Sequence, residues 1–209
     1  MNILIFGASG KTGRHLVTQA LDKGHHVTTF LRDPAKLDIR HERLVIFKGD
    51  VADYSKTEEA IKGQEIVLSA LGARSPFKFD PVIVQGMNNI IRSMESNGVK
   101  RLIYLSFVGV SESRKDAGFM IRHIAPRLLK NEIAGHEARE QMIRQSRLDW
   151  TIVHAPKLTN GPGEKRYRNG INLKSKSFVT SLSRADVADF MLQQITDKKY
   201  IGLSPRIMN

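Results

Sequence analysis

Three glycines spaced three residues apart, Gly7, Gly10 and Gly13, follow a short apolar run at residues 2–6. Apolar residues with helical spacing begin directly after the third glycine. A strand, a glycine turn and a helix in this order present unpaired backbone N–H groups and the positive end of a helix dipole to an anion. The turn is therefore typical of a site for the pyrophosphate of NAD or NADP. The loop residues expected to bind it are Gly7, Ser9, Gly10, Lys11, Thr12 and Gly13.

Two charged residues after the second predicted strand bear on the choice between NAD and NADP. The strand at residues 25–31 is followed by Arg32 and Asp33. An acidic residue at this position would bind both ribose hydroxyls of NAD, whereas an arginine suits the additional phosphate of NADP. Arg32 is the better placed of the two, and Lys11 and Arg14 add positive charge nearby. We therefore expect NADP, while Asp33 leaves NAD as the alternative.

The ends of the other predicted strands supply the remaining candidate residues, because ligands of open α/β sheets lie beyond the carboxyl ends of the strands. Asp50 would accept a hydrogen bond from the adenine amino group, although an aspartate of an ordinary turn explains it nearly as well. Small residues after the fourth strand would let the backbone approach the centre of the cofactor, and Lys157 would contact ribose or substrate. The residues expected along the cofactor are Asp50, Val51, Leu71, Gly72, Ser106, Pro156 and Lys157.

Strand and helix patterns alternate along the whole chain, which predicts an α/β fold of the Rossmann type: a doubly wound parallel sheet with helices on both faces. We expect residues 1–209 to form a single domain, with residues 107–130 and 155–180 as the substrate side.

Ser55 and Glu58 form a predicted capping box, and Asp80 and Ser183 are further predicted N-caps. Strands are expected at 2–6, 25–31, 43–47, 65–71, 101–106 and 149–154. A first helix is expected between the glycine turn and Gly24, and further helices at 55–61, 81–97, 131–145 and 184–196.

The composition limits the class of protein. The chain has 209 residues, no cysteine and a net charge of +12, from 33 basic and 21 acidic side chains. The missing cysteines exclude disulfides and thiolate metal sites. The basic clusters at residues 114–130 and 157–176 lack interleaved aromatic residues, and no zinc or helix-turn-helix pattern occurs, so nucleic acid is not an expected partner. No apolar run approaches the roughly 20 residues of a membrane span, and no signal-peptide pattern is visible. We expect a cytoplasmic protein.

The chain resembles the atypical short-chain dehydrogenase/reductases, and within them the NAD(P)H-binding proteins that include biliverdin-IXβ reductase, also called flavin reductase, and NmrA-like regulators. The motifs that carry the resemblance are residues 7–13, 31–33, 49–51, 70–72, the strand of Ser106, residues 148–156 and residues 183–188. The resemblance implies NADP binding and hydride transfer to a flavin-, quinone- or tetrapyrrole-like acceptor, a small conjugated molecule. The alternative is a non-catalytic NADP-binding protein of the NmrA-like type that senses redox state and signals to a protein partner, and the lack of the usual tyrosine and lysine pair motivates it.

One departure from the family concerns the proton donor. The usual pair of tyrosine and lysine four residues apart is missing, because the residues four after Tyr54, Tyr104, Tyr167 and Tyr200 are Glu58, Val108, Ile171 and Ser204. Reduction of a conjugated acceptor is less demanding, since the acceptor delocalises the arriving charge. The candidate catalytic residues are Ser106 and His154, with His136 as a further histidine that could titrate near neutrality. No metal-ligand spacing is present, and a nucleotide-sugar epimerase is a weaker alternative.

Overall fold

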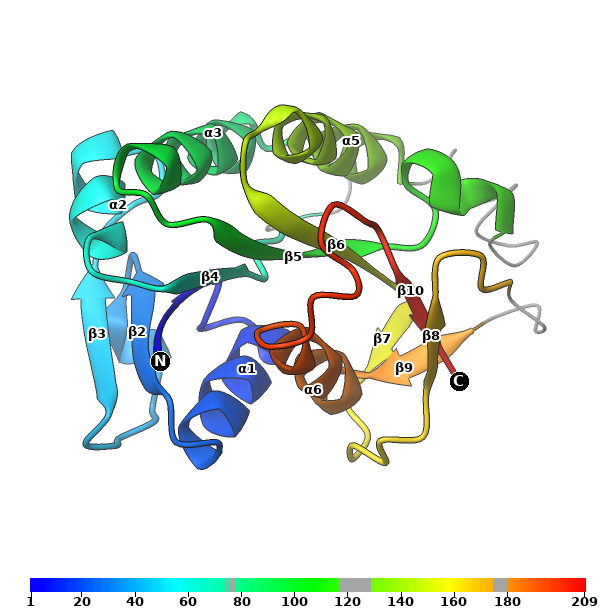
Figure 1. The fold of residues 1–209 in the computed structure, drawn as a ribbon, viewed down its shortest axis with the longest axis horizontal. Helices are drawn as coiled ribbons and strands as arrows, with labels where there is room; N and C mark the ends of the chain where they lie inside the picture. Colours follow the sequence, from blue (N-terminus) through cyan, green and yellow to red (C-terminus); the bar gives the residue numbers. More distant parts are fainter. Residues whose placement is uncertain (74, 76–77, 117–128, 175–179) are drawn as a thin grey trace.

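A computed structural model describes residues 1–73, 75, 78–116, 129–174 and 180–209. Eight strands form one sheet in the order β3-β2-β1-β4-β5-β6-β10-β8, and β7 pairs with β9 separately (Figure 1). The strands are β1 (Asn2–Phe6), β2 (His26–Leu31), β3 (Leu44–Lys48), β4 (Ile66–Ser69), β5 (Arg101–Phe107), β6 (Asp149–Ala155), β7 (Lys157–Thr159), β8 (Arg168–Gly170), β9 (Ser181–Ser183) and β10 (Arg206–Met208).

The sheet is parallel except for β8, which runs antiparallel to β10. The chain fills the sheet from β1 outward to β3 and then returns to place β4 on the other side of β1. The strand order therefore reverses between β1 and β4, and this is the point at which open α/β sheets bind their ligands. The predicted α/β doubly wound sheet of a single domain is confirmed.

Helices cover both faces of the sheet. Figure 1 shows α2, α3 and α5 on one face and α1 and α6 on the other. Their bounds are α1 (Lys11–Asp22), α2 (Tyr54–Ile61), α3 (Pro81–Ser96), α5 (Lys130–Gln145) and α6 (Arg184–Gln193), with short 3-10 helices η1 (Pro34–Lys36) and η2 (Ser111–Asp116). None of the helices in the described ranges is long and apolar enough to cross a membrane.

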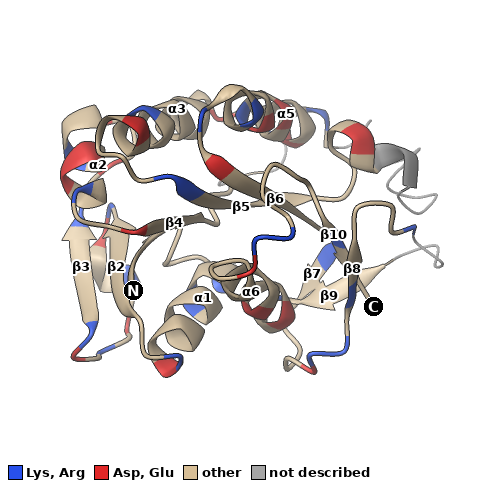
Figure 2. Cartoon of the chain, in the orientation of Figure 1, with Lys and Arg blue, Asp and Glu red and all other residues tan. Residues whose placement is uncertain are grey.

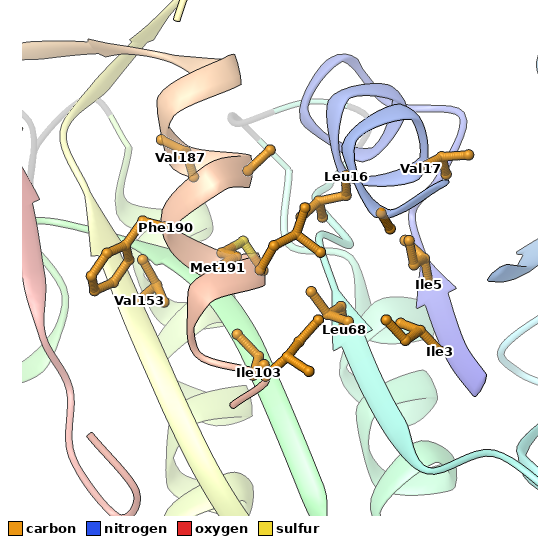
Figure 3. Close-up of a cluster of buried hydrophobic side chains, with 14 of the residues drawn as sticks. Ile3, Ile5, Leu16, Val17, Leu68, Ile103, Val153, Val187, Phe190 and Met191 are labelled. Atoms are coloured by element: carbon orange, nitrogen blue, oxygen red, sulfur yellow. The ribbon is translucent and has the colours of Figure 1, made fainter. Parts of the chain in front are cut away.

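Each face of the sheet has its own apolar core. Along β1, Ile3 and Ile5 point toward α1 and α6, whereas Leu4 and Phe6 point toward α2 and α3. Figure 3 shows the first of these cores, where Phe190 and other residues of α6 meet side chains of α1 and of the central strands. Because both faces of the central strands are buried, these strands are almost uniformly apolar. The two cores fix the carboxyl ends of β1 and β4 relative to the helices that follow them.

The helix caps test the predicted element boundaries. Asp80 caps α3 by accepting hydrogen bonds from the N–H groups at the start of the helix, and Ser183 caps α6 in the same way, so both predictions are confirmed. The predicted capping box at Ser55 is wrong. α2 begins one residue earlier, because the Asp53 carboxylate accepts from the Lys56 N–H at 3.1 Å and takes the role of the cap.

Candidate functional site

The glycine loop leaves the start of α1 open to an anion. Gly7 has a φ of +80°, and Gly10 is the N-cap of α1 but has no side chain with which to cap it. Within the described ranges, the N–H groups of Lys11, Thr12 and Gly13 have no protein acceptor. A Cβ on Gly10 would meet only the Gly7 carbonyl, at 3.2 Å, so its Cα borders open space. This cradle of backbone donors fits the pyrophosphate of a dinucleotide.

Two cavities lie on either side of this loop. The larger cavity, of about 490 Å³, is lined by residues 10–13 of the loop and by the ends of β4 and β5. The smaller cavity, of about 250 Å³, is lined by Gly7 and Ser9 and by the ends of β2 and β3. Leu71 and Gly72 line both cavities. The two cavities together therefore border the open start of α1, one on each side of the glycine loop.

The smaller cavity separates the two charged residues after β2. Arg32 lines this cavity, is exposed and has no protein partner in the described part of the chain. The Asp33 carboxylate instead accepts a hydrogen bond from the Ala35 N–H at 3.2 Å, and it caps η1. Arg14 is paired with Asp38 and so is engaged with the loop after β2. Arg32 is thus the cation of this group that faces the space where an adenosine ribose would lie.

Most of the residues expected along the cofactor line one of the two cavities. Those of the smaller cavity are Gly7, Ser9, Arg32, Val51, Leu71 and Gly72, and those of the larger one are Gly10, Lys11, Thr12, Gly13, Leu71, Gly72 and Ser106. Asp50, Pro156 and Lys157 line neither. Asp50 accepts from the Ala52 N–H at 3.0 Å, as an aspartate of an ordinary turn does, and Lys157 points outward from β7 while the next residue, Leu158, faces the larger cavity.

The predicted substrate side lies only partly within the described residues. Of residues 107–130 and 155–180, positions 117–128 and 175–179 are outside the described ranges. Phe107, Leu129 and Leu158 come from the remainder, and all three line the larger cavity. Its wall beyond the glycine loop is therefore mainly apolar.

A histidine and a glutamate of α5 stand at the far wall of the larger cavity. His136 and Glu132 lie one helical turn apart, and His136 Nε2 is 3.2 Å from Glu132 Oε1. The Tyr104 hydroxyl lies 2.8 Å from His136 Nδ1. Burial lowers the pKa of His136 below 6.5. Burial also opposes ionisation of Glu132, but the hydrogen bond and charge of His136 outweigh it and lower the pKa of that carboxyl.

Ser106, which also lines the larger cavity, belongs to a buried polar network. Its hydroxyl donates to Glu140 Oε1 at 2.6 Å, and His154 Nε2 lies 2.9 Å from the same oxygen. Arg144 reaches the other carboxylate oxygen at 3.2 Å. Burial of Glu140 opposes its ionisation, but His154, Ser106 and Arg144 together lower its pKa to about 2. Glu140 is therefore a carboxylate that fixes the position of Ser106.

The structure places the two candidate catalytic residues differently. Ser106 lines the larger cavity, whereas His154 is fully buried on β6 and does not line it. His154 reaches the cavity only through Glu140 and Ser106, and its Nδ1 has no hydrogen-bond partner among the described residues. A direct contact of His154 with a bound nicotinamide is not part of this arrangement.

Three charged residues of the site were not predicted from the sequence: Glu132, Glu140 and Arg184. Arg184 lines the larger cavity from the first position of α6. The one sequence signal for Glu132 was its spacing of four residues from His136 on a predicted helix. No group of three or more histidine or carboxylate side chains in the described residues could hold a metal ion.

The sequence pattern of the NAD(P)H-binding protein family matches residues 7–198, which include the glycine loop and both cavities. The chain belongs to the NAD(P)H-binding family. This membership supports the binding of a nicotinamide cofactor. It places the chain among NAD(P)H-binding oxidoreductases and confirms the resemblance drawn from the motifs.

Individual relatives agree with this family. The photosystem II assembly factor Ycf39 of Synechocystis is 26% identical over 156 residues, which cover 73% of this chain and 44% of Ycf39. The chain thus spans less than half the length of that relative.

ChuY, an anaerobilin reductase from Escherichia coli O157:H7, superposes with a TM-score of 0.80 at 19% identity, covering 99% of this chain and 96% of ChuY. A short-chain dehydrogenase/reductase from Veillonella parvula in complex with NADP superposes with a TM-score of 0.80 at 21% identity, covering 100% of this chain and 94% of that protein. At these identities, the two structures show the shared fold.

Proposed function

We propose that this member of the NAD(P)H-binding family is an NADPH-dependent reductase that transfers hydride to a conjugated acceptor of the flavin, quinone or tetrapyrrole type. The observation that carries the proposal is the larger cavity, which continues from the open start of α1 past Ser106 to an apolar wall. A flat acceptor held against Phe107 and Leu158 would lie beside the position of a nicotinamide. The solved structures that share the fold include ChuY, an anaerobilin reductase, which is in keeping with this proposal.

The residues of the chain would hold the cofactor at three places. The N–H groups of Lys11, Thr12 and Gly13 would bind the pyrophosphate, and Arg32 would pair with the 2′-phosphate of NADPH. Leu71 and Gly72 would border its centre, where the two cavities meet. When bound there, the cofactor supplies the hydride. Asp50, Pro156 and Lys157 remain proposed contacts at the ends of their strands.

Ser106 and His154 are proposed to act as a unit at the nicotinamide end. Ser106 lines the larger cavity and its hydroxyl hydrogen is donated to Glu140, so a hydrogen bond to a ligand would be accepted by the hydroxyl oxygen. Glu140 holds Ser106 from behind, and His154 holds Glu140. Ser106 would therefore orient the reacting ring, with His154 as a positioning residue. The proton that completes the reduction of the acceptor would come from solvent, because the delocalised product needs no strong acid beside it.

The proposed function is tested by measuring NADPH oxidation in stopped flow with FMN, menadione and biliverdin. Oxidation of NADPH that depends on at least one of these acceptors, with NADPH preferred to NADH, is the expected result. Tight NADPH binding with no acceptor-dependent oxidation across the panel would overturn the proposal of a reductase.

The second candidate is a redox-sensing regulatory protein that binds NADP without turnover. The absence of the tyrosine and lysine pair supports it, as does the partial similarity to Ycf39, which is named an assembly factor. This function predicts micromolar binding of NADP, no turnover, and a protein partner whose co-purification differs between NADP⁺ and NADPH.

A further inference from the structure

The larger cavity carries opposite charges on two of its walls. Glu132 enters it from α5, on one face of the sheet, and Arg184 enters it from α6, on the other face. Figure 2 shows the basic and acidic residues scattered over the helices, strands and loops of the fold. The two side chains therefore give this apolar cavity one acidic and one basic end.

The Glu132 carboxylate is held in place with one oxygen free. Its Oε1 lies 3.2 Å from His136 Nε2, and the His136 side chain is only 8% exposed. An ionised carboxylate can only accept hydrogen bonds. His136 Nε2 therefore carries the hydrogen, and Nδ1 accepts from the Tyr104 hydroxyl at 2.8 Å. In the described part of the chain, Glu132 Oε2 has no partner, so it is available to a ligand of the cavity.

Arg184 is also held by one of its nitrogens only. Nη1 donates to Asn160 Oδ1 at 2.7 Å and to the Leu158 carbonyl at 3.3 Å. Its Nη2 and Nε have no acceptor among the described residues. A guanidinium fixed in this way can bind a phosphate or carboxylate with its remaining N–H groups.

Building on the proposed reductase function, we infer that Glu132 and Arg184 determine which acceptor the cavity takes. Glu132 accepts a hydrogen bond from an N–H at the edge of a planar heterocycle, and Arg184 pairs with an anionic group on a side arm of the same molecule. A phosphorylated flavin and a linear tetrapyrrole with carboxylate arms share this chemistry. A quinone offers only carbonyl oxygens, which the Glu132 carboxylate repels, so quinones are poor ligands of the cavity.

The first experiment compares acceptors in wild type and Glu132→Gln. Wild type should bind and reduce FMN at least tenfold better than menadione. Glu132→Gln should weaken FMN binding, measured by calorimetry with NADP⁺ present, and lower kcat/KM for FMN by about tenfold, the loss expected when a hydrogen bond to a charged group becomes a neutral one. The same variant should leave menadione unchanged or improve it, because the new amide N–H groups can donate to a carbonyl. Glu137→Gln, an exposed glutamate on the same helix, is the matched control.

The second experiment tests the anionic arm with pairs of ligands that differ only in charge. Arg184→Gln should reduce the preference for FMN over riboflavin, and for biliverdin over its dimethyl ester, by about tenfold or more. The first pair reports on a phosphate arm and the second on carboxylate arms. Acceptor affinities are measured by calorimetry with NADP⁺ present, so the preferences are read without turnover.

These measurements separate the two proposals. The inference is supported if Glu132→Gln loses the preference for FMN over menadione and Arg184→Gln loses the preference for the charged ligand of each pair. This holds even if no acceptor oxidises NADPH and the reductase function fails. Turnover in wild type with unchanged preferences in both variants would overturn the inference and leave the reductase function standing. A wild-type preference for menadione would also overturn it.

Discussion

At the scale of single residues, Arg32 and Asp33 are neighbours in sequence with different surroundings. Arg32 lines the smaller cavity and has no partner for its guanidinium among the residues that the structure describes, while Asp33 is engaged in capping η1. This difference supports the proposed preference for NADP, because Arg32 lines the smaller cavity and Asp33 does not. The unpaired charge is exposed, so its contribution is that of one charge-assisted contact rather than of a buried ion pair.

We predict that Arg32→Ala weakens NADP binding by about tenfold and changes NAD binding little, because the lost contact is with the 2′-phosphate alone. Calorimetric titration of the variant with NADP⁺ and NAD⁺ measures both effects. Arg40→Ala, an exposed arginine of the same loop, should leave both affinities unchanged. Equal losses of affinity for NADP and NAD would show that Arg32 does not bind the 2′-phosphate.

The residues that sequence patterns predicted best are those whose role depends on local geometry. The glycine loop, Arg32 and the caps Asp80 and Ser183 act within a few residues of their own backbone, and the sequence contains their signals. Glu140 is different. It is fully buried, although glutamate is rarely buried without partners, and its partners lie on β5 and β6. Only the packing of α5 on the sheet reveals that pairing.

At the scale of the element, α1 depends on two glycines for different reasons. A Cβ on Gly13 would lie 2.1 Å from the Gly7 carbonyl oxygen, which is backbone and cannot move aside easily. A Cβ on Gly10 would meet the same oxygen at 3.2 Å, and the Gly10 φ of −71° suits an alanine. Gly13 is therefore required for packing, whereas Gly10 keeps the anion cradle open.

We predict that Gly10→Ala weakens NADPH binding at least tenfold while lowering the stability by less than about 1 kcal/mol, because the new methyl group enters the cradle. Gly13→Ala should destabilise the fold by about 1–3 kcal/mol through overcrowding. Urea unfolding and calorimetry on the two variants measure these effects. Full cofactor affinity in a folded Gly10→Ala protein would contradict the proposed cradle.

The helix α5 carries a second prediction, which concerns acid stability. The pKa of Glu140 is lowered from an ordinary 4.5 to about 2. A carboxyl whose pKa is lowered in the folded state stabilises the fold at every pH above its pKa in the unfolded state. This contribution to the free energy of unfolding is lost as the pH falls from about 5 toward 2. The lowering corresponds to about 3 kcal/mol.

Urea unfolding from pH 7 to pH 3 compares wild type with Glu140→Gln. The variant should be less stable at pH 7 by about 3 kcal/mol, and the difference should shrink as the pH falls below 5. Glu137→Gln, on the exposed side of α5, should follow the wild-type curve. A difference between wild type and Glu140→Gln that stays constant with pH would show that the lowered pKa of Glu140 does not stabilise the fold.

At the scale of the whole molecule, the alternating strand and helix patterns were enough to predict a doubly wound parallel sheet with helices on both faces, whereas the point where the strand order reverses came from the structure. They did not predict β8 and β10, which are three residues long and too short for a periodic signal. The lining of the larger cavity from both faces of the sheet was also not predicted from the sequence. Glu132 and Arg184 are separated by about fifty residues, and only the packing of α5 and α6 on opposite faces brings both to one space.

The sheet, the glycine loop and the two cavities together predict one arrangement of cofactor, and a crystal structure of the protein with NADPH tests it most directly. The account predicts the pyrophosphate against the N–H groups of Lys11, Thr12 and Gly13, the 2′-phosphate at Arg32 and the nicotinamide beside Ser106. NADPH bound elsewhere, or an empty cradle at the start of α1 in a crystal saturated with NADPH, would contradict it.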